Sequence, residues 1–267
     1  IQCINKKMNS MISYKDVIQS PTIELLALQL MKQGTKPKDE VEFIPLSNKG
    51  KFNVFCFPTG FGLGMTFIEM ARLLEQDFNI YVTDFMDHCS NYKNMLEEYV
   101  EGILNIQEEG PYILLGYCAG GNLAFEIAKV MESKGKHISD IIMLDKTIRN
   151  KEINEMFENK ASYLELEHTN IPEWATTPYA QNKYNKFRKY LGQLDNKDTV
   201  QANIHNLTVD TITNSYKKKW ANHTIKEYVE YAGIGTHDEL LDPEFIDYNV
   251  EIIKRILTQI TMAKVLK

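Results

Sequence analysis

Cys118 is the residue of this chain that is best suited to act as a nucleophile. It stands in the motif G-Y-C-A-G-G at 116–121, after the apolar run 113–115 and before a helical pattern of apolar residues. This order predicts a strand, a tight turn and a helix, with the thiol exposed at the turn. Glycines suit such a turn because its backbone is strained and its neighbours lie close. Free N–H groups at a helix N-terminus stabilise a thiolate or an oxyanion, so the motif indicates nucleophilic acyl transfer.

A nucleophilic thiol needs a general base, and His237 is the histidine in the right setting. It ends the motif G-I-G-T-H at 233–237, between the last strand pattern and the final helical pattern. In folds with this kind of turn, the base follows the last strand. The other histidines lack that setting and are predicted to be surface residues: His88, His137, His168, His205 and His223.

A carboxylate must orient the imidazole, and two aspartates compete for this role. Asp145 ends the strand pattern that follows the nucleophile helix, whereas Asp210 ends the strand pattern before the one that leads to His237. Both satisfy the chain order nucleophile, acid, base. The order of the residues alone does not decide between them.

The elements that must position these residues follow an alternating pattern. From Val41 onward, apolar strand patterns alternate with helical ones, such as 91–107 and the segment after Asp242-Pro243. This alternation predicts an α/β protein with a mostly parallel sheet wrapped by helices, and the nucleophile turn specifies the α/β-hydrolase fold. The expected strands are 41–46, 53–57, 80–84, 112–115, 141–144, 207–209 and 228–231.

The segment 150–199, called the lid segment below, is too long for a simple crossover between strands. It carries helical patterns near 153–166 and 179–194, and insertions of this size in a compact domain are usually functional. We interpret it as a helical lid over the active site, although its aromatic residues could equally form a small core of their own. These residues are Tyr163, Trp174, Tyr179, Tyr184, Phe187 and Tyr190, of which Trp174, Tyr179, Tyr184 and Phe187 are the candidates for substrate binding.

Composition excludes several classes of function. The chain has 267 residues, a formal net charge of -6 and a pI near 5.6, which argues against a nucleic-acid surface. No apolar run approaches the ~18 residues of a membrane helix. The four cysteines show no disulfide or zinc spacing, so we expect no metal and a reducing, cytoplasmic compartment. The chain begins with Ile and shows no signal peptide, as an excised piece of a larger cytosolic protein would.

Three segments together resemble the terminal thioesterase domains of nonribosomal peptide synthetases, of the surfactin-synthetase type. They are G-Y-C-A-G-G-N-L-A-F-E from 116, I-I-M-L-D ending at Asp145, and G-I-G-T-H-D-E-L-L from 233. The resemblance implies that Asp145 is the acid. Most members of this family have Ser at the nucleophile position, where this chain has Cys118.

Residues 1–33 resemble the last two helices of a peptidyl carrier domain, and 34–40 reads as a polar linker to a thioesterase domain at 41–267. The alternative for this segment is an unrelated helical hairpin. In the carrier family, the serine that bears phosphopantetheine lies just upstream, which would place it before Ile1. The resemblance therefore implies a carrier domain in cis as partner, with phosphopantetheine as the tether of a peptidyl thioester substrate and no cofactor for the chemistry itself.

The expected reaction consists of two acyl transfers. Cys118 attacks the thioester, and the backbone N–H groups of Ala119 and Gly60 hold the oxyanion, since Gly60 lies in a turn after a strand. Release is predicted to occur by macrocyclisation to a lactone or lactam, because a large aromatic lid would fold the peptide back on itself. The alternatives are hydrolytic release, an editing thioesterase or general esterase of the same fold, and a non-catalytic binding module.

Overall fold

The computed structural model describes residues 16–17, 20, 22–32, 43–86, 89, 91–151, 154–155, 178–209 and 218–265. The chain divides into two compact units, residues 1–40 and 41–267. In the first unit, helix α3 (Ile23–Lys32) follows Thr22, whose hydroxyl accepts a hydrogen bond from the N–H of Leu25 at 3.2 Å. A threonine in this position satisfies a free N–H of the first turn and fixes the helix start. The predicted linker at 34–40 lies outside the described residues.

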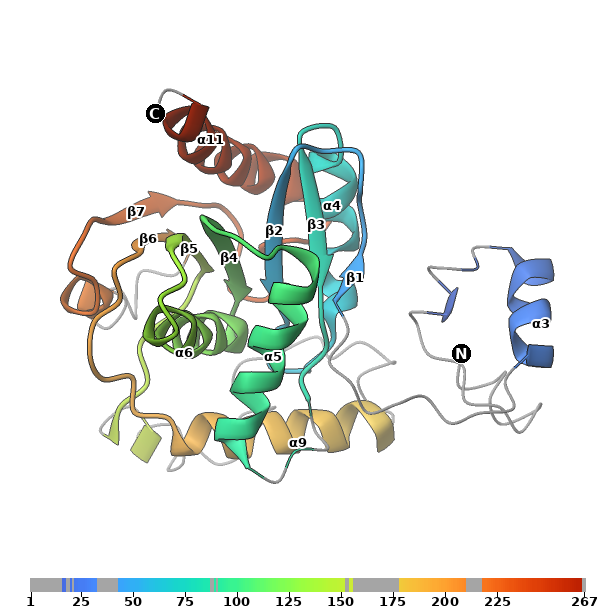
Figure 1. The fold of residues 1–267 in the computed structure, drawn as a ribbon, viewed down its shortest axis with the longest axis horizontal. Coiled ribbons are helices and arrows are strands. Elements are labelled where there is room, and N and C mark those ends of the chain that lie inside the picture. Colours follow the sequence, from blue (N-terminus) through green and yellow to red (C-terminus); the bar gives the residue numbers. More distant parts are fainter. Residues whose placement is uncertain are drawn as a thin grey trace. The chain divides into compact units, whose positions relative to one another are not determined.

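The described part of the second unit contains one seven-stranded sheet with strand order β1-β3-β2-β4-β5-β6-β7 (Figure 1). β1 pairs antiparallel with β3, and every other neighbouring pair is parallel. The mostly parallel sheet expected from the sequence is confirmed, and each predicted strand overlaps an observed one. The strands are β1 (Ile44–Pro45), β2 (Phe52–Phe57), β3 (Phe78–Val82), β4 (Tyr112–Tyr117), β5 (Ile138–Leu144), β6 (Asn203–Thr208) and β7 (Tyr228–Ala232).

Helices cover both faces of this sheet. α5 and α6 pack against each other on one face, and α4 and α11 contact each other on the other face (Figure 1). All six residues of β4 are buried as a result, which explains why that strand reads as a continuous apolar run. The helices are α4 (Ile68–Leu74), α5 (Tyr92–Ile106), α6 (Ala119–Ser133), α9 (Pro178–Gln193) and α11 (Ile246–Val265), together with the 3-10 helices η1 (Gly64–Phe67) and η3 (Lys218–Asn222).

β5 and β6 begin earlier than the apolar pattern predicts, at Ile138 and Asn203. The reason is a buried polar pair: Nε2 of His205 on β6 lies 3.0 Å from Oδ1 of Asp140 on β5. The hydroxyl of Tyr231 on β7 lies 3.2 Å from Nδ1 of the same imidazole. Polar residues that hydrogen-bond to one another can be buried in the middle of a sheet. A search for apolar runs does not detect such residues. The prediction that His205 is a surface residue is wrong, because only 9% of it is exposed.

Helix α9 belongs to the lid segment and confirms the helical pattern predicted at 179–194. Phe187 is fully buried and stacks on Phe85, with ring centroids 4.1 Å apart. On the same helix, Nζ of the buried Lys183 donates a hydrogen bond to the carbonyl of Phe85 at 2.8 Å. α9 is therefore fixed to the loop that follows β3. Among the described residues, none of the helices is both long enough and apolar enough to cross a membrane.

Candidate active site

Cys118 occupies a sharp turn between β4 and α6. Its backbone has φ 53° and ψ -122°, a strained conformation for a residue with a side chain. The glycines of the motif are required by space: a Cβ on Gly116 would lie 2.2 Å from the carbonyl carbon of Gly120, and one on Gly120 would lie 2.2 Å from the carbonyl oxygen of Phe57. The motif therefore has glycine at these two positions because the strand, the turn and the helix lie too close together for side chains.

Asp145 and His237 form a direct hydrogen bond. Oδ2 of Asp145 lies 2.7 Å from Nδ1 of His237, and Oδ1 accepts a hydrogen bond from the N–H of Val209 at 2.9 Å. The carboxylate is 2% exposed and the imidazole 25%. Asp145 has φ 50°, and its own N–H donates to the carbonyl of Leu207 at 2.7 Å, so the turn after β5 aims the carboxylate at the imidazole. The competing Asp210 lies outside the described residues.

The environment of His237 favours its charged form. Burial opposes the imidazolium, but the charge of Cys118 and the hydrogen bonds with Asp145 and Cys118 outweigh it and raise the pKa of His237 well above its ordinary value. Cys118, His237 and Asp145 thus interact in series. The hydroxyl of Tyr117, the residue before the nucleophile, donates to the backbone carbonyl of His237 and ties the turn to the histidine loop.

Asn249 on α11 holds the histidine loop in place. Its side chain accepts a hydrogen bond from the N–H of Ile234 at 3.0 Å and donates to the carbonyls of Ile234 and Leu240, each at 2.9 Å. It is fully buried. Sequence reasoning missed this residue; the available signal was an asparagine in the first turns of a helix that otherwise buries apolar residues. Gly235 in the same loop has φ 88°, a conformation that favours glycine.

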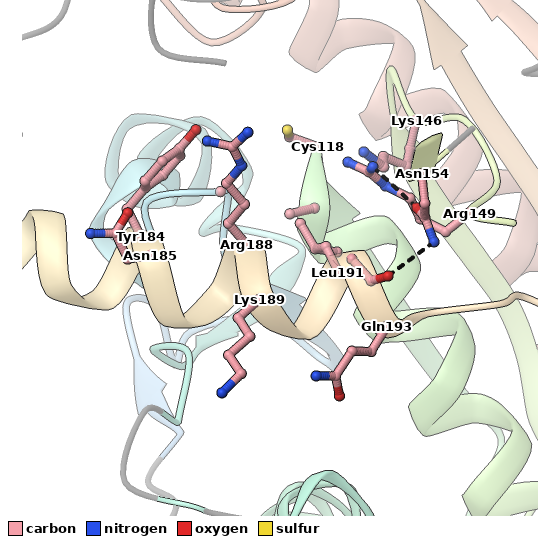
Figure 2. Close-up of a pocket in the computed structure, with 13 residues that line it drawn as sticks. Cys118, Lys146, Arg149, Asn154, Tyr184, Asn185, Arg188, Lys189, Leu191 and Gln193 are labelled. Carbon is pink, nitrogen blue, oxygen red and sulfur yellow. Dashed lines mark hydrogen bonds between the residues drawn. The ribbon is translucent and has the colours of Figure 1, made fainter. Parts of the chain in front are cut away.

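Cys118 opens into a cavity of about 410 Å³, one side of which is formed by helix α9 (Figure 2). Gly60 and Ala119, the two residues predicted to hold an oxyanion, line this cavity beside the thiol. As the first residue of α6, Ala119 has an N–H with no acceptor inside its own helix. The other lining residues are Lys146, Arg149, Asn154, Tyr184, Asn185, Arg188, Lys189, Leu191, Gly192 and Gln193.

The predicted lid residues divide into separate groups. Tyr184 lines the cavity, and its contact with the substrate stays a prediction. Phe187 does not: its ring faces Phe85 in the packing of α9, so its position corrects the expectation that it binds substrate. Helical periodicity could not separate these two roles, because both side chains lie on the buried side of α9. Trp174 and the side chain of Tyr179 lie outside the described part of the chain.

Comparison with known proteins identifies the family. The profile of the thioesterase domain family matches residues 52–252. The chain belongs to this family. The expected similarity to the thioesterase domains of nonribosomal peptide synthetases is confirmed, as is the α/β-hydrolase fold. Cys118, His237 and Asp145 all lie within the matched range.

Two bacterial synthases illustrate the similarity of this thioesterase domain. It is 36% identical over 261 residues to a mycosubtilin synthase protein of Bacillus subtilis, covering 95% of this chain and 10% of the relative. It is 27% identical over 269 residues to a surfactin synthase protein of Bacillus subtilis (strain 168), covering 97% of this chain and 20% of the relative. The chain therefore spans a fifth or less of the length of these relatives.

Solved structures match as well. The thioesterase domain SrfTE, described for the cyclization of the lipopeptide antibiotic surfactin, has 27% sequence identity and a TM-score of 0.64, covering 78% of this chain and 91% of that one. The Vlm2 thioesterase domain has 15% identity and a TM-score of 0.64, covering 80% and 96%. At that identity, the second match shows the fold alone.

Proposed function

We propose that this thioesterase domain releases a peptide from a carrier-bound phosphopantetheine thioester through an acyl-Cys118 intermediate. The observation that carries the proposal is the series Cys118, His237 and Asp145, which follow β4, β7 and β5 respectively, with the imidazole bonded to the carboxylate at 2.7 Å. A thiol held on a helix N-terminus next to such a pair is the arrangement that acyl transfer requires.

In the first transfer, Cys118 attacks the thioester carbonyl as a thiolate, its proton having passed to His237, whose charged form the site favours. Because Nδ1 of His237 is bonded to Asp145, we assign its N–H to that nitrogen and leave Nε2 to accept the proton. The N–H groups of Ala119 and Gly60 hold the tetrahedral oxyanion. The intermediate collapses by breaking the bond to the pantetheine sulfur, which leaves as a thiol with the proton from His237.

In the second transfer, His237 deprotonates the acceptor that attacks the acyl-Cys118 carbonyl. We propose an internal hydroxyl or amine of the peptide as acceptor, so that the product is a macrocyclic lactone or lactam. The location of α9 over the cavity and the 27% identity to SrfTE support ring formation. A thioester has a better leaving group than the oxyester that a serine would form, which makes amines easier acceptors for this chain. Hydrolysis uses the same groups with water as acceptor and is the second candidate.

A peptidyl carrier domain in cis is the proposed partner, and residues 1–33 are its proposed C-terminal part. The family profile begins at residue 52, whereas the match to the mycosubtilin synthase protein covers 95% of the chain and therefore extends well into this N-terminal segment. Such a carrier would supply the substrate on phosphopantetheine, and the chemistry would need no other cofactor.

Mapping of the acyl adduct tests the proposal. The chain is incubated with a peptidyl N-acetylcysteamine thioester, digested and analysed by mass spectrometry. We expect the adduct on Cys118, with none on Cys56, whose thiol is buried and has a pKa raised by that burial. The control is Cys118→Ala, which should remain unmodified. An adduct on Cys56 or Cys89 in the unsubstituted chain would overturn the assignment of the nucleophile.

A further inference from the structure

Lys183 on helix α9 is a buried lysine that the proposed reaction does not use. Only 4% of it is exposed, and its Nζ donates a hydrogen bond to the backbone carbonyl of Phe85 at 2.8 Å. The other lysines of the helix, Lys186 and Lys189, are exposed. Lysines are almost never fully buried unless the ammonium has a partner, because removing that charge from water is costly. The position of Lys183 therefore points to a role in what it contacts.

The stem of Lys183 lies against Gly62, in the segment 58–64 that follows β2 and is called the β2 turn below. A Cβ on Gly62 would lie 2.8 Å from Cγ and 3.0 Å from Cδ of Lys183, and 2.9 Å from Cβ of Phe85. Gly62 has φ 73°, a conformation that favours glycine. Glycine at this position lets the β2 turn and the lysine stem approach more closely than any side chain would allow.

The β2 turn carries Gly60, the proposed second donor of the oxyanion hole. The N–H of Gly62 donates to the carbonyl of Thr59 at 2.8 Å, which closes the turn around Gly60. The carbonyl of Gly62 accepts a hydrogen bond from the N–H of Phe85 at 2.9 Å. Lys183 therefore bonds to the residue that holds the β2 turn and also packs on the turn itself.

The two ends of the β2 turn are fixed by other elements. Its start lies against α6, because a Cβ on Gly120 would come within 2.2 Å of the carbonyl oxygen of Phe57 and 2.6 Å of that of Pro58. Its end is held by Asp84, whose Oδ1 accepts a hydrogen bond from the N–H of Gly64 at 2.8 Å. The middle of the turn, which carries the proposed oxyanion donor, meets helix α9 instead.

We propose that Lys183 is a positioning residue for the oxyanion hole, because it holds the β2 turn where the N–H of Gly60 meets the developing charge. This inference rests on the proposed function and adds a residue to its first acyl transfer. An oxyanion donor acts only at hydrogen-bond distance, and a misplacement of about 1 Å can cost about a hundredfold in rate. The position of α9 thus sets the rate at which Cys118 is acylated.

Two reactions of the same thiol test the inference. Acylation by a peptidyl N-acetylcysteamine thioester, measured as kcat/KM, passes through an oxyanion, whereas alkylation by iodoacetamide displaces iodide and forms no oxyanion. Lys183→Met keeps the apolar stem and removes the donor. We expect it to slow acylation of Cys118 by about ten- to a hundredfold and to leave the alkylation rate and its pH profile within about twofold. Lys186→Met, at an exposed lysine of the same helix, is the matched control and should change neither rate.

Gly62→Ala tests the same contact from the side of the turn. The added Cβ has to displace the lysine stem or the turn, so the same selective loss of acylation is expected. The matched control is Gly135→Ala, at φ 75°, where a Cβ would have no described atom within 4 Å. This control carries the same backbone strain without the contact and should keep both rates. If Lys183→Met misfolds, as judged by circular dichroism, the glycine pair decides.

Two results would overturn the inference while leaving the proposed function intact. One is unchanged acylation in folded Lys183→Met. The other is an equal loss of acylation and alkylation, which would mean that the lysine acts through the thiolate or through the fold as a whole. Failure of the unsubstituted chain to be acylated by any thioester probe would overturn the proposed function, and the inference with it.

Discussion

Both carboxylate oxygens of Asp145 have defined partners, Val209 N–H and His237 Nδ1, so an amide at this position changes the proton on the imidazole. In Asp145→Asn, the side-chain NH₂ can face Nδ1, which moves the imidazole proton to Nε2 and removes the base. We expect kcat to fall by about a thousandfold or more with little change in KM. Steady-state turnover of a peptidyl thioester measures this.

The control for that change is Asp238→Asn, which removes an exposed carboxylate next to His237 in sequence. Its activity should stay within about twofold of the original, as for most surface substitutions. Similar losses in the two variants would show that net charge near the histidine matters rather than the hydrogen bond. Full activity of Asp145→Asn would indicate that Asp210, and not Asp145, is the acid.

The raised pKa of His237 gives a second prediction at this scale. Burial works against the imidazolium, and the charge of Cys118 is the leading contribution that raises the pKa. Cys118→Ala should therefore lower the pKa of His237, as measured by NMR titration of the imidazole. An unchanged pKa would contradict the coupling. In the unsubstituted chain, the stabilisation from the charged imidazole is complete below about pH 6.5, the unfolded value, and is lost as pH rises through the folded pKa.

At the scale of elements, the end of the lid segment is joined to the nucleophile helix through Asn196. This residue is 2% exposed. Its Oδ1 accepts from Nδ2 of Asn122 and from the N–H of Arg149, and its Nδ2 donates to Oε1 of Glu126. The loop that carries Asp145 and Arg149 is therefore connected to α6, which begins at the nucleophile.

Asn196→Ala should destabilise the fold, because it leaves buried donors and an acceptor without their partners. We expect a loss of about 2–4 kcal/mol in the free energy of unfolding, measured by urea denaturation. Lys197→Ala removes the exposed neighbour, whose ion pair with Asp195 lies at the surface, and should leave the free energy of unfolding nearly unchanged. Equal effects of the two substitutions would show that the network around Asn196 contributes nothing to stability.

Sequence reasoning at this scale identified α9 but not what it does. The apolar positions of the helix predict a buried side, and Phe187 and Tyr184 both lie on it. Which of them meets the cavity depends on where Phe85 lies, and that residue is about one hundred positions away in the chain. Asn122, Asn196 and Asn249 were missed for the same reason, since most of their partners are backbone groups or side chains that only folding brings near.

For the whole molecule, the strands and the order of the reactive residues could be predicted because both faces of a parallel sheet are buried, which makes each strand a short apolar run. The first residues of β5 and β6 could not be predicted from the sequence, because Asp140 and His205 interrupt the apolar pattern and pair across the two strands. From the sequence, only the family resemblance favoured Asp145 over Asp210 as the acid. The structure adds the hydrogen bond with His237, which the order of the residues does not contain.

Our proposal of ring closure rather than hydrolysis rests on helix α9. α9 covers the cavity at Cys118 and contributes the apolar surfaces of Tyr184 and Leu191. A cover of this kind keeps water from the acyl-enzyme and raises the effective concentration of an internal nucleophile.

We therefore expect the authentic linear peptidyl thioester to give mainly a product one water lighter than the free acid, as measured by liquid chromatography and mass spectrometry. Cys118→Ser is the matched control, since it keeps α9 and the histidine but forms an oxyester. With an amine as internal acceptor, the serine variant should give a lower ratio of ring to acid, because the oxyester has the poorer leaving group. A dominant free acid from the unsubstituted chain would contradict cyclisation and leave hydrolytic release as the function, since the same Cys118, His237 and Asp145 would then transfer the acyl group to water.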